Sequence, residues 1–204
     1  MLCGFACVAL GIGGTLPAAA VTKAPGLLGI EDLPGSFQQV APPTTLPSFN
    51  TVVVDQKTCN ETVRPIAGIS GAVSVFFDRT GVTTDRDTVS EYVLSFPDAK
   101  TAKVAFALEA RSATAGAKCR MVGFVPPGTT TPVSIVNLAH IKFPKVGSAS
   151  VALGTTPTGG LTLTTVTFLR GPYIVIVSTP GTPEAPSRQE LQTIVTRAER
   201  RLST

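Results

Sequence analysis

The sequence is poor in several residue types on which common activities depend. Its 204 residues include no tryptophan and a single histidine, and aromatic residues make up only 6%. Charged residues account for 15%, against about 25% in a typical globular domain. With 43% hydrophobic residues, a wholly disordered chain is excluded. The net charge of +4 is small and dispersed along the chain, so it does not indicate nucleic-acid binding.

The N-terminal stretch up to Leu16 has no charged side chain and is mostly aliphatic or small. Pro17 and three alanines then supply the small residues that signal peptidase accepts. The stretch is shorter than the roughly 20 residues that span a membrane. We therefore expect residues 1–20 to be a signal peptide, the mature chain to begin near Val21, and the protein to be secreted or held in the periplasm or cell envelope.

Other readings of this end remain open. The first alternative to a signal peptide is a retained N-terminal anchor, and the second is a buried cytosolic helix. Cys3 and Cys7 suggest a lipoprotein, but Gly4 stands where a lipidation signal requires Leu or Val. Membrane association is expected only if the N-terminus is anchored or lipidated.

Two cysteines remain in the expected mature chain, Cys59 and Cys119. An exported protein meets an oxidising compartment, and two thiols allow only one pairing, so we predict a Cys59–Cys119 disulfide. The alternative is a pair of buried free thiols. Zinc binding is disfavoured because no CxxC or HxxxH pair accompanies these cysteines.

The proline-rich segment 21–47 is expected to be extended, with one short helix near 26–33 that ends before Pro34. Thr58 and Glu61 form a capping-box pattern, which predicts a helical turn over residues 59–63.

Residues 48–204 are expected to form one domain. Apolar residues at three- and four-residue steps, Leu108 among them, predict a helix from about Asp98 to Ala115. Ser187 and Glu190 begin a second helix that reaches Leu202. Alternating or β-branched runs predict strands at 72–78, 88–96, 118–125, 133–143, 148–153, 161–169 and 173–177. This order predicts an α+β fold, a single domain with a mostly antiparallel sheet covered by two main helices.

Several segments also occur in a recognisable order. They are Leu27-Leu28, Asp32-Leu33-Pro34-Gly35, Cys59, the run Ser95-Phe96-Pro97-Asp98-Ala99 before an alanine-rich helix, Cys119, and Arg170-Gly171 before an aliphatic strand and a basic last helix. This pattern resembles the exported sensor-like domains of mycobacteria and related actinobacteria. That group includes the extracellular domain of certain receptor kinases and many small secreted proteins and lipoproteins of unknown function.

The resemblance implies an antiparallel sheet with packed helices, disulfides, and a cleft proposed to bind a ligand. Receptor-type members carry a second disulfide, whereas the expected mature chain has cysteines for only one. The sequence also contains no kinase domain, so signalling by this chain alone is not implied.

No convincing catalytic or metal-binding motif occurs. His140 has no G-x-S-x-G partner and is expected at the surface, near a strand end. Asp78, Asp85 and Asp87 flank a loop without the oxygen ladder of an EF-hand, which favours a solvated hairpin tip over a calcium site. We therefore predict no catalytic residue, no metal and no cofactor.

Two further patterns have structural explanations. Arg197, Arg200 and Arg201 lie at the end of the last helix, where cations complement the helix dipole. Asn60-Glu61-Thr62 fits an N-glycosylation acceptor, but we interpret it as part of the capped turn.

The sequence therefore predicts a non-enzymatic exported domain that binds an unknown small molecule, lipid or envelope protein in a cleft whose residues it does not identify. The alternative is a carrier that holds an apolar envelope lipid in an internal cavity. A hydrolase that uses carboxylates such as Glu91 or Asp98 is a further, weaker alternative.

Overall fold

The computed structural model describes residues 26–35, 37–80, 88–124, 133–136, 138–155, 162–181 and 186–202. The helical elements are the 3-10 turn η1 (Ile30–Asp32), α1 (Ala99–Cys119) and α2 (Arg188–Arg201). The strands are β1 (Phe37–Gln39), β2 (Thr44–Leu46), β3 (Asn50–Val54), β4 (Glu61–Pro65), β5 (Gly71–Arg79), β6 (Thr88–Ser95), β7 (Met121–Phe124), β8 (Val133–Val136), β9 (Leu138–His140), β10 (Ala149–Thr155), β11 (Thr162–Arg170) and β12 (Tyr173–Gly181).

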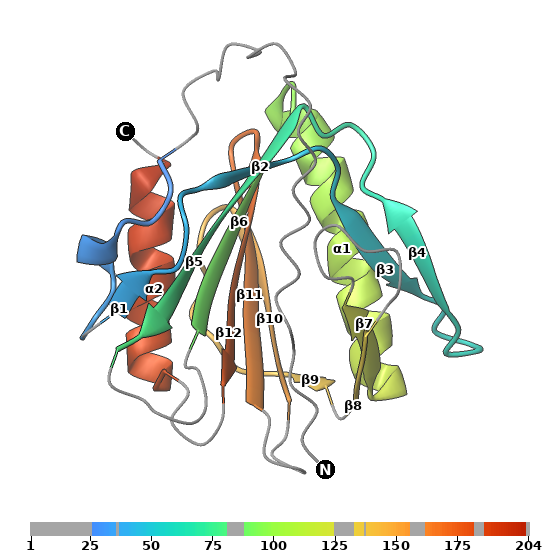
Figure 1. Cartoon of the computed structure of the whole chain (residues 1–204). Helices are drawn as coiled ribbons and strands as arrows, with labels where there is room; N and C mark the ends of the chain where they lie inside the picture. The colour runs from blue at the N-terminus through green and yellow to red at the C-terminus, as the bar shows by residue number, and fades with distance from the viewer. Residues whose placement is uncertain are drawn as a thin grey trace, which may run out of the picture.

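An eight-stranded antiparallel sheet forms the centre of the molecule (Figure 1). Its strand order is β1-β5-β6-β12-β11-β10-β9, and β2 also pairs with β5. The hairpin of β11 and β12 is the one that the alternating sequence predicts, and Gly171 allows its turn with a φ of +56°. Two short ribbons, β3–β4 and β7–β8, complete the strands of the described residues.

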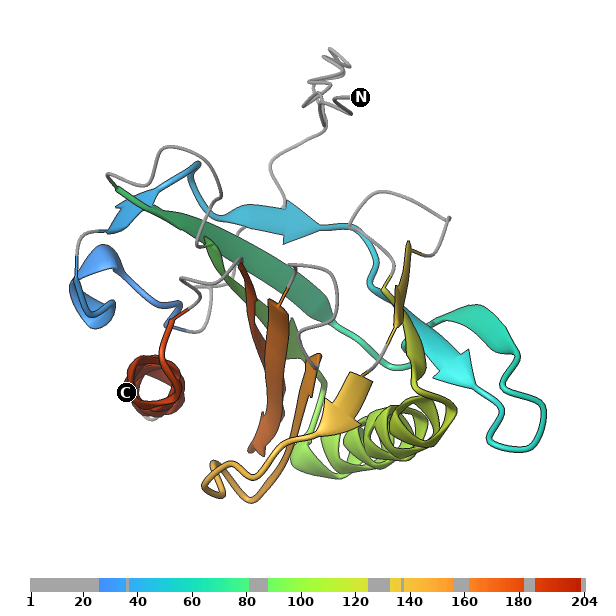
Figure 2. The same cartoon turned by 90° about the horizontal axis from the view of Figure 1, so that it is seen from below.

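The two helices lie on opposite faces of this sheet (Figure 2). Alternation along each strand makes this possible, because successive side chains point to opposite faces. In β6, for example, Val89 and Val93 join the core under α2, whereas Leu94 joins the core under α1. The predicted α+β fold with two helices covering a mostly antiparallel sheet is therefore confirmed.

Both helices begin where the sequence predicts, but α1 ends later than predicted. Asp98 caps α1 by accepting the Thr101 N–H at 2.7 Å, and Ser187 and Glu190 form the predicted capping box of α2. However, α1 continues to Cys119 and ends where Arg120 adopts a left-handed conformation with a φ of +56°. The prediction of a strand that begins at residue 118 is therefore wrong at its start.

The predicted helical turn over residues 59–63 is also wrong, because β4 begins at Glu61 and pairs with β3. The reversal is made by Asp55, whose Oδ1 accepts the N–H groups of Lys57 at 2.7 Å and Thr58 at 3.2 Å. The capping pattern at Thr58 therefore does not start a helix. The chain forms a turn there instead, and this turn allows five residue pairs between β3 and β4.

Two smaller expectations also change. The helix near 26–33 is only the single 3-10 turn η1, and the strand expected over 133–143 is divided into β8 and β9. The segment before residue 47 adds β1 and β2 to the edge of the main sheet at β5, so the segment contributes to the sheet. Across the described ranges, no helix combines the length and apolar character needed to cross a membrane.

Candidate functional site

The β3–β4 ribbon stands beside the main sheet and packs against α1. Its helix-facing side forms a small apolar cluster that consists of Val52, Val54, Val63, Ala115 and Cys119. Because side chains alternate along a strand, Thr51 and Val53 belong to the other face of the ribbon. Thr51, Val53 and Val54 all line the groove described below, so both faces of β3 contribute to it.

A serine hydroxyl of α1 forms hydrogen bonds with backbone groups of β3. The Ser112 hydroxyl donates to the Val52 carbonyl at 2.7 Å and accepts the Val54 N–H at 3.2 Å. One turn earlier in the helix, the Thr51 hydroxyl donates to Glu109 Oε2 at 2.7 Å. These contacts fix the position of the ribbon relative to α1.

The disulfide between Cys59 and Cys119 fixes the tip of the ribbon. It joins the β3–β4 connection to the last residue of α1, and the two Cα atoms are 5.6 Å apart. The predicted pairing is therefore present in the structure. Its place in the fold shows that the bridge links a hairpin tip to a helix end rather than two strands of the main sheet.

A groove of about 1130 Å³ lies between α1 and the ribbon. Its apolar lining includes Val53, Ile66, Val104 and Leu108. The volume is comparable to ligand sites, which commonly measure about 300–1,000 Å³. The groove is therefore large enough for a small molecule or a short peptide segment.

Val104 and Leu108 are exposed apolar residues of this lining, with 59% and 58% of their surface accessible. The sequence pattern assigned Leu108 to the core-facing stripe of the helix, and the structure corrects that assignment. The core of this helix is formed instead by its small residues and Phe106, which fit closely against the sheet.

The groove also contains charged residues of both signs. Lys100, Arg111 and Arg64 are exposed cations in its lining. Its two acids are already engaged, since Asp98 caps α1 and Glu109 accepts from Thr51. The Thr101 N–H lowers the pKa of Asp98, whereas burial raises the pKa of Glu109. The cations outnumber the acids, and none of the three makes an ion pair among the described residues.

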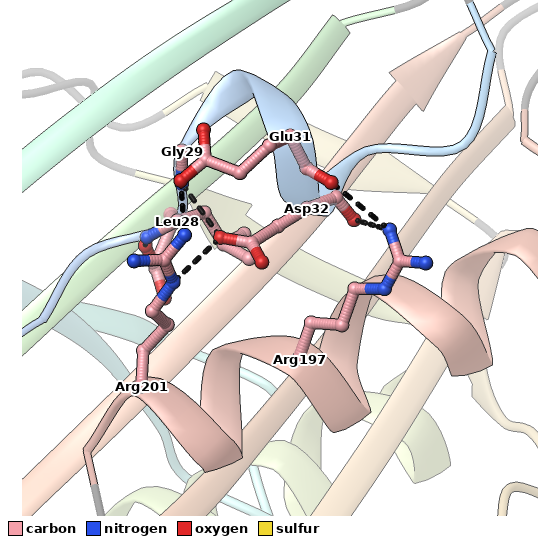
Figure 3. A network of polar contacts seen from close by, with 7 residues as sticks. Leu28, Gly29, Glu31, Asp32, Arg197 and Arg201 are labelled. Carbon is pink, nitrogen blue, oxygen red and sulfur yellow. Dashed lines mark hydrogen bonds and ion pairs between the residues drawn. The ribbon is translucent and has the colours of Figure 1, made fainter. Parts of the chain in front are cut away.

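A second polar cluster lies on the α2 side of the sheet, where the N-terminal segment meets that helix (Figure 3). Arg197 donates to the backbone carbonyls of Glu31 and Asp32, the second contact at 2.7 Å. Arg201 pairs with the carboxylates of the same two acids, and its Nε lies 2.8 Å from Asp32 Oδ2. The predicted role of these arginines as simple dipole partners is therefore incomplete, because they hold η1 onto α2.

Glu91 lies beneath this cluster and is fully buried. Its Oε2 accepts the Leu28 N–H at 2.7 Å, and its Oε1 has no hydrogen-bond partner among the described residues. Burial raises the pKa of Glu91 to about 7; the Leu28 N–H lowers it, and the negative charge of Asp32 raises it further. This carboxylate holds the backbone of the N-terminal segment.

The structure does not bring together the two carboxylates that a hydrolase would have used. Glu91 is buried on the α2 side of the sheet, and Asp98 is exposed at the start of α1. His140 is exposed at the end of β9, as expected, and Asp78 accepts a hydrogen bond from Thr88 at 3.1 Å. Asp85 and Asp87 lie outside the described residues, and among the residues that are described no group of three His, Cys, Asp or Glu could hold a metal ion.

Sequence reasoning did not identify the residues of the groove. Lys100, Val104, Leu108 and Arg111 follow helical spacing and would have been visible as a second stripe beside the core-facing one. The ribbon wall could not be found in this way, because residues 59–63 were expected to be helical.

Comparisons with known proteins agree with this fold. No family model matches the chain, and no curated protein matches it in sequence. The chain is similar to the crystal structure of the extracellular domain of PknH from Mycobacterium tuberculosis, with a TM-score of 0.51 over 85% of this chain and 93% of that chain. Sequence identity is 15%, so the likeness is one of fold. The chain thus shares its fold with this extracellular domain.

Proposed function

We propose that this chain is an exported, non-enzymatic domain that binds a ligand or partner in the groove between α1 and the β3–β4 ribbon. The observation that carries the proposal is the exposure of Val104 and Leu108 within a groove of about 1130 Å³. Apolar side chains that gather in a concave surface with a few polar groups are typical of binding sites.

The way the groove is built supports the same conclusion. Its ribbon wall is held by Ser112, by Glu109 and by the Cys59–Cys119 bridge, so the wall is positioned before any ligand arrives. A preformed site avoids part of the ordering cost of binding. A disulfide in this position also suits an oxidising compartment.

Export is part of the proposal. The apolar stretch before Val21, the disulfide, and the shared fold with an extracellular domain all support it. We propose a leader over residues 1–20 and a proline-rich segment over 21–47 whose strands β1 and β2 pair with the binding domain of residues 48–204. Intact-mass analysis of the protein secreted by its native host should give a chain that begins near Val21, and a secreted species that retains Met1 to Ala20 would contradict the leader.

A non-enzymatic role accords with the separation of Glu91 from Asp98 and with the structural contacts that each makes. The carrier alternative requires an enclosed apolar cavity. Val104 and Leu108 are instead more than half accessible to solvent, which favours binding of a surface that remains partly exposed.

Nuclear magnetic resonance of the isotopically labelled protein tests the site. Fractionated envelope extract from the native host should contain a component that shifts amide resonances of α1 and β3. The variant Leu108→Glu should lose these shifts. Val40→Glu is the matched control, because Val40 is also an exposed apolar residue, at 54%, and is not part of the groove. Shifts centred elsewhere, or chemical turnover of the bound component, would overturn the proposal.

A further inference from the structure

One stripe of α1 presents a regular series of side chains to the groove. Lys100, Val104, Leu108 and Arg111 follow steps of four, four and three residues, which place them on one side of the helix. All four side chains are exposed. Along the helix the order is cation, apolar, apolar, cation, and the two cations are roughly 16 Å apart at 1.5 Å per residue.

The facing wall adds a third cation. Arg64 of β4 pairs in register with Thr51 of β3, so the two side chains lie on the same face of the ribbon, and both line the groove. Neither Arg64 nor the two cations of α1 has an ion pair among the described residues. The two acids of the lining are occupied by the Thr101 N–H and the Thr51 hydroxyl. Three cations thus share the lining with two acids, so the groove offers an apolar centre with an excess of positive charge around it.

We propose that the groove binds an extended acidic peptide segment of a partner protein, in which two apolar side chains contact Val104 and Leu108 and flanking carboxylates meet Lys100, Arg111 and Arg64. The inference rests on the proposed function and names the class of its ligand. Opposite charge at the ends of an apolar contact fixes both orientation and specificity.

The distance between the two apolar side chains of the stripe matches the spacing of alternate residues in an extended peptide. Val104 and Leu108 are about 6 Å apart along the helix axis. In an extended peptide, residues i and i+2 lie on the same side and about 6.6 Å apart. Two alternate apolar residues can therefore contact these two side chains, and acidic residues two positions further out on each side reach the cations.

The distribution of charge favours a peptide over a lipid. A single-chain anionic lipid carries its charge at one end, so it would match one cation and leave the others desolvated or unpaired. A peptide can carry carboxylates on both sides of its apolar residues. The stripe has a cation at each end, so carboxylates on both sides of the peptide's apolar residues can each meet a cation.

Selection from a display library of random dodecapeptides tests the inference with the full chain as target. The wild type should enrich sequences in which Asp or Glu flanks a pair of alternate apolar residues. The double variant K100E/R111E should bind those peptides at least roughly tenfold more weakly and should instead enrich peptides flanked by Lys or Arg. Glu at position 100 lies in the first turn of α1, where an acid is favourable, so the fold should persist, and circular dichroism checks this.

Two controls separate the groove from general surface properties. Lys145→Glu reverses an exposed charge outside the groove and should leave selection unchanged. The pair V104S/L108S should remove binding of the selected peptides, whereas Val40→Ser should retain it.

The remaining outcomes contradict the inference in distinguishable ways. If no peptide is enriched, or if the enriched peptides lack acidic flanks, the peptide class is wrong. If palmitate in phosphatidylcholine vesicles shifts the groove resonances and no peptide does, the ligand is a lipid and the proposed site survives. If selected peptides map to another surface, both the inference and the proposed site fail.

Discussion

The buried carboxylate of Glu91 accepts a hydrogen bond of 2.7 Å from the backbone N–H of Leu28, 63 positions earlier in the chain. This contact attaches the N-terminal segment to the middle of the main sheet. It also leaves Glu91 Oε1 buried without a partner among the described residues, so the ionised form is poorly solvated. The stability of the domain should therefore depend on the protonation of one residue.

Glu91→Gln should remove that dependence. The pKa of Glu91 in the folded chain is about 7, above its ordinary value of 4.5, so folding favours the protonated form. Its contribution is complete below about pH 4.5 and is lost as the pH rises through about 7, for a total of about 3 kcal/mol. Urea unfolding should show the variant gaining stability over the wild type at pH 8 but not at pH 4.5. Parallel pH profiles for the two proteins would refute the assignment.

Ser112→Ala should weaken the attachment of the ribbon to α1. The substitution leaves the Val54 N–H and the Val52 carbonyl without their partner, at a cost of about 1–3 kcal/mol in the free energy of unfolding. Thr114→Ala is the matched control, because the exposed Thr114 hydroxyl donates to the Ala110 carbonyl of its own helix. Chemical denaturation measures both variants. An equal loss in the two would show that the hydroxyl bridge contributes nothing specific.

Replacement of both cysteines by serine should lower stability and loosen one wall of the groove. The bridge closes a 60-residue separation, for which the chain-entropy model gives about 4 kcal/mol. Hydrogen exchange should accelerate most in β3, β4 and the last turn of α1, beyond the change that global unfolding causes in α2. Uniform acceleration across the chain would indicate that the bridge acts on the unfolded state alone.

Arg197→Ala should release the η1 segment from α2. The side chain donates to two backbone carbonyls, at 3.3 Å and 2.7 Å, and these would lose their partner. We expect the Leu28 amide to exchange at least roughly tenfold faster, which corresponds to about 1.4 kcal/mol. Arg200→Ala is the control, since Arg200 is exposed and the hydrogen bonds and ion pairs from α2 to η1 among the described residues come from Arg197 and Arg201. If both variants behave alike, the segment is held by Arg201 and Glu91 instead.

Much of this fold could be predicted from sequence because its signals are local. Alternation identified β11 and β12, and the residues Asp98, Ser187 and Glu190 marked the starts of both helices through side-chain contacts within one turn. These contacts join neighbours in the chain, so the sequence displays them directly.

The site was less predictable because it depends on distant partners. Glu61 could cap a turn in isolation, but pairing with Val54 makes it part of a strand. Leu108 fits an apolar helical stripe, yet the sheet lies on another side of α1 and leaves this residue to the groove. The buried position of Glu91 likewise depends on Leu28 and on α2, neither of which is adjacent in sequence.

The close approach of Gly26 to α2 has a consequence for how the domain can be attached to other structures. A side chain at Gly26 would place its Cβ only 2.5 Å from the backbone carbonyl oxygen of Arg201, so the first and last parts of the described chain touch. Residues 26 and 201 therefore lie together at α2, whereas α1, which lines the groove, lies on the opposite face of the sheet (Figure 2). An attachment made directly at residue 26 or at residue 202 would therefore lie on the α2 side, away from the groove. For the same reason, a short linker between residues 202 and 26 should give a circular permutant that keeps the groove intact.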